Sequence, residues 1–237
     1  MDEMLGEFLG TMILVLLGDG VVAGVMLGKS KARDAGWIVV TAGWAFAVMA
    51  GVYTARGLGA PGFVNPVGPF VAALNHLMPA DRAARLAGAE FAGAFAGAVL
   101  VWLHYFPHWA ETRDADAKRA VFCTSPAIRH YPANVVSEAI ATFALVFVGT
   151  WIIEREVGSG FLAPLGGALV WGIGLSLGAT TGYAINPARD LGPRLAHFLL
   201  PIPGKGHSDW GYAWVPVIGP LIGGALAALL VKLAKPI

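Results

Sequence analysis

Two stretches decide the fold of this chain: Gly62-Phe-Val-Asn-Pro-Val67 and Gly182-Tyr-Ala-Ile-Asn-Pro-Ala-Arg-Asp190. Each Asn-Pro pair lies in a glycine-rich apolar region and opens a segment that is too short to cross a membrane. Proline is tolerated at the first helical position, where its missing N–H group would have no partner, and the asparagine before it can cap the helix. Two such pairs in corresponding places of two apolar halves predict half-helices that meet near the middle of a bilayer.

The composition is that of a multi-pass membrane protein. The chain is 57% hydrophobic and 13% charged, whereas soluble domains carry about 25% charged residues. A net charge of +1 argues against a nucleic-acid partner. The single cysteine, Cys123, excludes an internal disulfide and a cysteine-based metal cluster. We expect no metal and no cofactor.

Six apolar stretches are long enough to span a membrane, which takes roughly 20 residues. The first has an acidic start and a long apolar run, and is therefore interpreted as a span and not as a cleavable signal. The expected spans are Met4–Leu27, Gly36–Thr54, Leu86–Tyr105, Val135–Ile153, Phe161–Thr181 and Tyr212–Leu233.

Two further apolar stretches are interrupted by prolines and follow the second and fifth spans. They cover Ala60–Pro79 and Ile185–Pro203. The run from Pro66 to Leu77 would form on the order of 18 Å of helix, about half a bilayer. Both stretches therefore predict re-entrant segments, because irregular backbone at membrane depth has to be buried in protein or line a cavity.

The two halves of the chain resemble each other. Glu7-Phe-Leu-Gly-Thr11 in the first span matches Glu138-Ala-Ile-Ala-Thr142 in the fourth. Three spans per half is an odd number, so the second copy has to be inverted relative to the first. We predict one transmembrane domain over residues 1–237, with repeats at about 1–106 and 133–237. The polar linker at 107–132 is interpreted as a solvated loop.

At these motifs the sequence resembles the major intrinsic protein family, the aquaporins and glycerol facilitators, from Glu7 to Pro220. The second motif is specific to that family, and the first is a variant with Phe63-Val64 and Val67 where the family usually has His-Leu and Ala. The resemblance implies an all-α membrane protein of six transmembrane helices and two re-entrant half-helices arranged as an inverted repeat. It also implies a homotetramer.

Further positions resemble the glycerol-facilitator, or aquaglyceroporin, branch. These are Asp190 directly after the arginine, Arg194 four residues later, and Pro216-Val217 at the start of the last span. By position, the resemblance implies a selectivity constriction formed by Trp44, Gly174, Tyr183 and Arg189.

The resemblance also assigns roles around the half-helix starts, Pro66-Val67 and Pro187-Ala188. Asn65 and Asn186 would each donate a side-chain N–H into the passage, and the helix N-termini would disfavour cations there. The alternative is that both asparagines are simple helix caps.

The charged residues leave alternatives open. An arginine inside a membrane usually serves function, but Arg189 could also pair with Asp190 or anchor a lipid headgroup. Glu7 and Glu138 are interpreted as structural supports that accept backbone N–H groups, with a proton relay as the alternative. Asp190 and Arg194 are expected to pair along one turn of helix. No role is assigned to Asp19.

The predicted function is a passive channel in the cell membrane for glycerol and other small uncharged solutes, which also conducts water. Further candidate permeants are urea, dihydroxyacetone, hydrogen peroxide and neutral lactic acid. No nucleophile with a base in a readable spacing and no nucleotide loop is found, which argues against an enzyme. A water-selective channel, a proton-coupled secondary carrier and a purely structural membrane protein remain alternatives. The basic residues do not favour a topology with the N-terminus inside.

Overall fold

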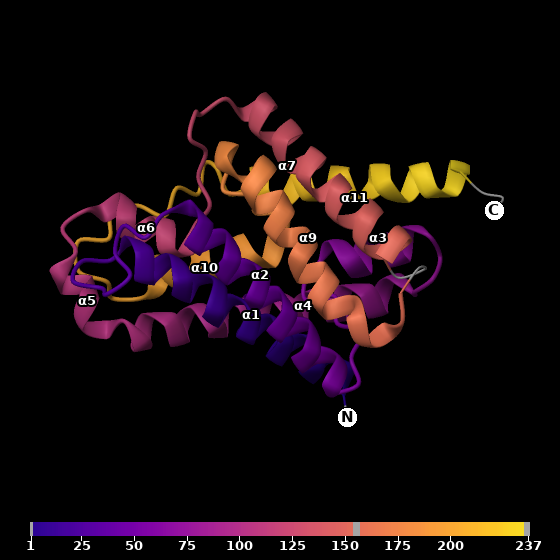
Figure 1. Cartoon of the computed structure of the whole chain (residues 1–237), viewed down its shortest axis with the longest axis horizontal. Coiled ribbons are helices and arrows are strands. Elements are labelled where there is room, and N and C mark those ends of the chain that lie inside the picture. Colours follow the sequence, from indigo (N-terminus) through magenta and orange to yellow (C-terminus); the bar gives the residue numbers. More distant parts are fainter. Residues whose placement is uncertain (1, 154–156, 235–237) are drawn as a thin grey trace.

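The computed structural model describes residues 2–153 and 157–234, and over these ranges every regular element is helical. Six helices are long and apolar enough to cross a membrane (Figure 1). These are α1 (Glu3–Met26), α2 (Trp37–Gly57), α4 (Ala80–His104), α7 (Tyr131–Val146) with its π-helical continuation η1 (Phe147–Ile153), α9 (Leu162–Leu177) and α11 (Val215–Ala234). Short 3₁₀ turns flank α9 on both sides, η2 (Ser159–Phe161) and η3 (Gly178–Thr180).

Both expected half-helices are present. The first, α3 (Val67–Leu74), has 8 residues, and the second, α10 (Pro187–Leu199), has 13. At 1.5 Å per residue they measure about 12 and 20 Å, too short to span a bilayer. The first ends earlier than expected, because His76 adopts a left-handed conformation with a φ of 57°. The second half-helix, α10, packs mainly against α4 of the other half.

The fourth helix begins earlier than the apolar pattern indicated. The expected span Leu86–Tyr105 omits the first turns of α4, which start at Ala80. Those turns carry Asp81 and Arg85, whose side chains form an exposed ion pair of 2.8 Å along the helix. Because charged residues lower the hydropathy of the first turns, an apolar pattern places the start of this helix too late in the sequence.

Small residues allow the helices of each half to approach closely. A Cβ atom at Gly93 of α4 would lie 2.2 Å from the carbonyl oxygen of Phe8 in α1. A Cβ at Gly223 of α11 would lie 2.2 Å from the carbonyl oxygen of Ala139 in α7. The pairs α1–α4 and α7–α11 therefore pack in the same backbone-to-backbone way, as transmembrane helices with small interface residues do.

Replacing Gly93 by alanine is expected to destabilise the bundle, since the methyl group has no space beside α1. Overpacking of this kind costs about 1–3 kcal/mol. The matched control is Gly88→Ala in the same helix, because a Cβ there would meet nothing within 4 Å. Thermal denaturation in detergent should show a lower midpoint for the first variant. Equal midpoints for the two variants would contradict the close α1–α4 contact.

The interpretation of residues 107–132 as a solvated loop is wrong for its first part. This segment contains α5 (Phe106–Glu111) and α6 (Ala115–Phe122), which lie together at one end of the bundle (Figure 1). Trp109 is buried, stacks on Phe122 at 5.4 Å between ring centroids, and donates its indole N–H to the carbonyl of Trp102. The many charged residues of the segment gave a polar sequence pattern that concealed these buried aromatic side chains, although one of them, Lys118, is itself buried.

Candidate functional site

A buried glutamate in α1 holds the loop before the first half-helix. Glu7 is completely buried, and its Oε1 accepts hydrogen bonds from the backbone N–H groups of Gly62 at 2.6 Å and Phe63 at 3.0 Å. Its Oε2 accepts from the N–H of Val64 at 2.8 Å. Three backbone donors that no helix satisfies are thus paired at membrane depth.

Glu138 in α7 makes the corresponding contacts in the second half. Its Oε1 accepts from the hydroxyl of Thr181 at 2.6 Å and from the N–H of Ala184 at 3.0 Å. Its Oε2 accepts from the N–H of Ile185 at 2.9 Å. Each glutamate therefore binds the loop residue that directly precedes a half-helix asparagine.

Those two loop residues are strained. Val64 has a φ of 46° and Ile185 a φ of 44°, values that β-branched side chains rarely adopt. Such a conformation costs on the order of 1–3 kcal/mol and persists only where the surroundings enforce it. The hydrogen bonds from both N–H groups to buried carboxylates help to enforce it here.

The asparagines join the two half-helices at their tips. Asn65 donates from Nδ2 to the carbonyl of Ile185 at 2.9 Å, and Asn186 donates from Nδ2 to the carbonyl of Val64 at 2.8 Å. Each strained residue is therefore bonded to a glutamate of its own half and to the asparagine of the other half. Because a carboxamide nitrogen carries two hydrogens, each asparagine has a second N–H beyond the one used in this cross-link.

The same side chains also cap the half-helices. Asn65 accepts through Oδ1 from the N–H of Val67 at 3.1 Å. Asn186 accepts from the N–H groups of Ala188 at 3.0 Å and Arg189 at 3.2 Å. Capping and cross-linking thus use different atoms of one side chain, so capping does not exclude a further donor role.

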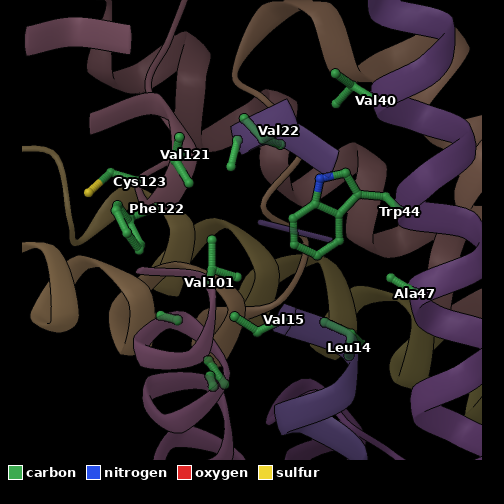
Figure 2. Packing of buried hydrophobic residues seen from close by; sticks show 14 of the residues in the cluster. Leu14, Val15, Val22, Val40, Trp44, Ala47, Val101, Val121, Phe122 and Cys123 are labelled. Carbon is green, nitrogen blue, oxygen red and sulfur yellow. The ribbon is translucent and has the colours of Figure 1, made fainter. Parts of the chain in front are cut away.

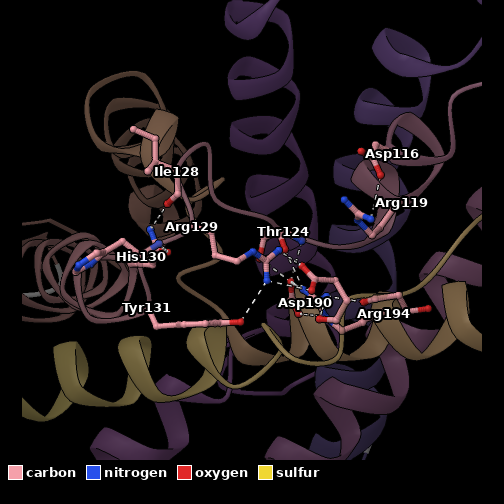
Figure 3. A network of polar contacts seen from close by, with 12 residues as sticks. Asp116, Arg119, Thr124, Ile128, Arg129, His130, Tyr131, Asp190 and Arg194 are labelled. Carbon is pink, nitrogen blue, oxygen red and sulfur yellow. Dashed lines mark hydrogen bonds and ion pairs between the residues drawn. The ribbon is translucent and has the colours of Figure 1, made fainter.

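Asp190 does not pair with its neighbour Arg189. Its carboxylate instead receives Arg194 at 2.7 Å, together with the N–H and hydroxyl of Thr124 (Figure 3). Arg194 is fully buried and donates onward to the carbonyls of Ser208 and Asp209. The network ties α10 to the segment after α6 and to the loop before α11.

A lysine from that loop holds the other end of α10. Lys205 donates from Nζ to the carbonyls of His197, Phe198 and Leu200 at 2.6–2.7 Å. Partial burial lowers the pKa of Lys205 from its ordinary value. The second half-helix is therefore fixed at its N-terminus by Asn186 and at its C-terminus by a cation, which suits the helix dipole there.

Three of the four expected constriction residues line one cavity. This cavity of about 510 Å³ is open at the end of the bundle that carries α6, and Trp44, Tyr183 and Arg189 are among its lining residues. The Cζ of Arg189 lies 4.1 Å from the centre of the Trp44 ring, within cation–π distance. Figure 2 shows the indole pointing from α2 towards Val22 of α1.

The fourth residue, Gly174, lies against the ring of Tyr183. A Cβ there would be 2.9 Å from the Cζ of Tyr183 and 3.0 Å from the methyl group of Thr41. The carbonyl of Gly174 accepts the indole N–H of Trp37 at 3.0 Å, and the Trp37 and Tyr183 rings meet edge to face at 5.7 Å. The absence of a side chain at Gly174 therefore leaves the space in which Tyr183 lies.

This geometry is accompanied by clear similarity to known proteins. The model of the family described as Major intrinsic protein matches residues 1–231. The chain belongs to this family. It is 53% identical over 228 residues to "Glycerol uptake facilitator protein 3" of Lactiplantibacillus plantarum, covering 96% of this chain and 95% of that protein. It is also 53% identical over 230 residues to the "Probable glycerol uptake facilitator protein" of Thermotoga maritima, covering 97% and 98%.

A solved structure confirms the fold. The aquaglyceroporin from Plasmodium falciparum superposes with a TM-score of 0.83 at 26% identity, and the match covers 98% of each chain. The predicted architecture of six transmembrane helices and two half-helices is therefore confirmed. This major intrinsic protein is an integral membrane channel and not an enzyme.

Sequence reasoning missed Trp37 and Glu90 in this major intrinsic protein, and it named Asp19 without assigning it a role. Trp37 lines the cavity beside Tyr183, and nothing in the pattern distinguishes it from an aromatic residue at the membrane interface. Asp19 and Glu90 are completely buried within α1 and α4. A carboxylate inside an apolar span is itself a signal for function, and this signal could have identified Glu90 as well as Asp19.

Proposed function

We propose that this major intrinsic protein is a passive channel for glycerol that also conducts water. The observation that carries the proposal is the cavity wall formed by Arg189, Trp44 and Tyr183. A guanidinium group offers several N–H donors in one plane and can bind two neighbouring hydroxyl groups, whereas the aromatic faces suit a hydrocarbon backbone. Glycerol has one edge of hydroxyl groups and one edge of carbon, so it matches both sides of the wall.

Beyond the cavity, the tips of the half-helices continue the passage. The second N–H of Asn65 and of Asn186 is the proposed donor to a passing hydroxyl or water oxygen, once the first is used in the cross-link. The N-termini of α3 and α10 add positive potential at the same place, which disfavours cations. A route of this kind suits uncharged solutes.

Glu7 and Glu138 are proposed as structural supports. Both oxygens of each carboxylate already accept hydrogen bonds from the loops before the half-helices. A proton relay would have to break these bonds in every cycle, which argues against a proton-coupled carrier. The division into repeats at 1–106 and 133–237 and the homotetramer stay predictions.

Two relatives named for glycerol uptake and a neighbour named an aquaglyceroporin support the choice of glycerol. Urea, dihydroxyacetone, hydrogen peroxide and neutral lactic acid are uncharged and no larger than glycerol, and they are proposed as further permeants on that ground.

Stopped-flow light scattering on proteoliposomes tests the proposal. A glycerol gradient should cause shrinkage followed by reswelling that is much faster than in protein-free liposomes, while an impermeant sugar should cause shrinkage alone. Fast shrinkage without glycerol reswelling would refute the polyol channel and favour a water-selective one.

Replacing Arg189 by alanine should relax selectivity, because the donor side of the wall is lost and the Trp44 ring loses its stacking partner. We expect the rate of entry of four- and five-carbon polyols to rise about tenfold. A fitted site discriminates by about this factor against a ligand that is one methylene group too large. The control is Arg85→Ala, an exposed arginine in a surface pair. Unchanged relative rates for these polyols would contradict the assignment of Arg189 to the constriction.

A further inference from the structure

A carboxylate with no assigned role lies directly behind the constriction. Asp19 in α1 is completely buried, and its Oδ1 is 3.5 Å from Nη1 of Arg189. Within the described part of the chain, neither oxygen of Asp19 has a hydrogen-bond partner. Nη1 of Arg189 has none there either. The carboxyl and the guanidinium thus face each other inside the protein.

The other nearby carboxylate is already occupied. Asp190 receives two nitrogens of Arg194 and both donors of Thr124. Among the described ion pairs, Arg189 occurs once, with Asp19. Asp19 is therefore the carboxyl group that faces the arginine of the cavity wall.

The arginine is held between two elements. Asp19 lies on the α1 side, and the Trp44 ring covers the guanidinium from α2 at 4.1 Å. The indole in turn lies against Gly18, where a Cβ would be 2.2 Å from Cζ3 of the ring. Two consecutive residues of α1 thus set the positions of both the cation and the aromatic face.

We propose that Asp19 is a specificity-determining residue, which holds Arg189 at the α1 side of the passage and cancels its charge. The constriction then presents N–H donors without net charge, which favours uncharged hydroxylated solutes over tightly held water. This inference rests on the proposed function and deepens it, since it assigns to α1 a part in selecting polyols. Asp19 acts through Arg189 and does not itself contact the solute.

The variant Asp19→Asn tests the proposal. It removes the compensating charge, so the guanidinium binds water more strongly and is free to move into the passage. Glycerol then has to displace that water, whereas water itself does not. We expect the ratio of glycerol to water permeability to fall about fivefold, within the range that coupling between two neighbouring residues produces. An unchanged ratio would overturn the proposal.

Two controls accompany this variant. Asp81→Asn makes the same chemical change at an exposed carboxylate of a surface pair and should leave the ratio as in the wild type. Asp19→Glu keeps the charge beside Arg189 and should retain most of the wild-type ratio. A ratio as low in Asp19→Glu as in Asp19→Asn would indicate that side-chain size matters at this position and charge does not, which contradicts the proposal.

If Asp19→Asn fails to fold, a double variant still tests the proposal. Asp19→Asn combined with Arg189→Gln removes both charges and leaves no buried ion without a partner. Because Asp19 acts through Arg189, the double variant should fold and pass glycerol at a higher ratio to water than Asp19→Asn alone. A double variant that does not fold, or whose ratio stays as low as in the single variant, would overturn the proposal.

The wild type, measured in the same vesicles, separates failure of the proposed glycerol channel from failure of the role proposed for Asp19. If it passes water or urea but no glycerol, the proposed function fails. In that case the role of Asp19 is tested with urea in place of glycerol. The ratio of urea to water permeability should again be lower in Asp19→Asn than in the wild type.

Discussion

Replacement of Glu138 by glutamine is expected to prevent stable assembly of the channel. The carboxylate accepts from Thr181, Ala184 and Ile185, and all three donors are buried. A carboxamide offers one oxygen and one NH₂ group, so at least one donor would face another donor. Each buried donor left without a partner costs about 1–3 kcal/mol, and hydrogen bonds to a charged acceptor cost more.

The backbone adds to this effect. Ile185 is held at a φ of 44°, and its N–H bond to Glu138 helps to enforce that strained conformation. Its carbonyl is the acceptor for Asn65, so loosening the loop also loosens the junction of the half-helices. Loss of the Glu138 carboxylate should therefore destabilise both halves of the protein.

The measurements are the yield of monodisperse protein in size-exclusion chromatography and the midpoint of thermal denaturation. Glu111→Gln is the matched control, because Glu111 is exposed and forms a surface pair with Lys29. A fully stable Glu138→Gln protein would contradict the structural role. If its transport had also lost a dependence on the proton gradient, the carrier hypothesis would be favoured.

Replacement of Gly174 by histidine is expected to suppress glycerol passage much more than water passage. The new Cβ would lie 2.9 Å from the Tyr183 ring, so that ring has to move. Tyr183 lines the cavity, and displacement of its ring into the cavity would narrow the passage. We expect at least about a tenfold loss of glycerol permeability, in line with the steric discrimination of fitted sites.

Gly172→His is the control for this experiment. It lies in the same helix, α9, and a Cβ at Gly172 would meet nothing within 4 Å. Glycerol and water permeability should both stay near the wild-type values in this control. Equal loss of both permeabilities in Gly174→His would indicate misfolding, and unchanged glycerol permeability would show that Tyr183 does not border the passage.

The membrane-spanning helices and the two half-helices of this fold could be predicted from the sequence because each has a local signal. Six apolar runs indicated the spans, and the Asn-Pro pairs indicated the half-helices, which are present as α3 and α10. The linker was misinterpreted because its many charged residues give a polar pattern, whereas Trp109 and Phe122 are buried in α5 and α6.

The candidate site depends on contacts between segments far apart in the chain. No local pattern indicates that Asn65 bonds to Ile185 or that Asp19 faces Arg189. The four constriction residues were assigned from family resemblance, and the structure places three of them around one cavity with Gly174 behind Tyr183. Their roles in selection stay predictions.

The central claim is passive passage of glycerol, and tracer uptake into proteoliposomes tests it most directly. Initial rates of labelled glycerol entry should be measured over a wide range of concentrations, with and without a pH gradient. A passive channel predicts rates that rise linearly with concentration and are the same in both conditions. Entry that saturates and requires the pH gradient would contradict it.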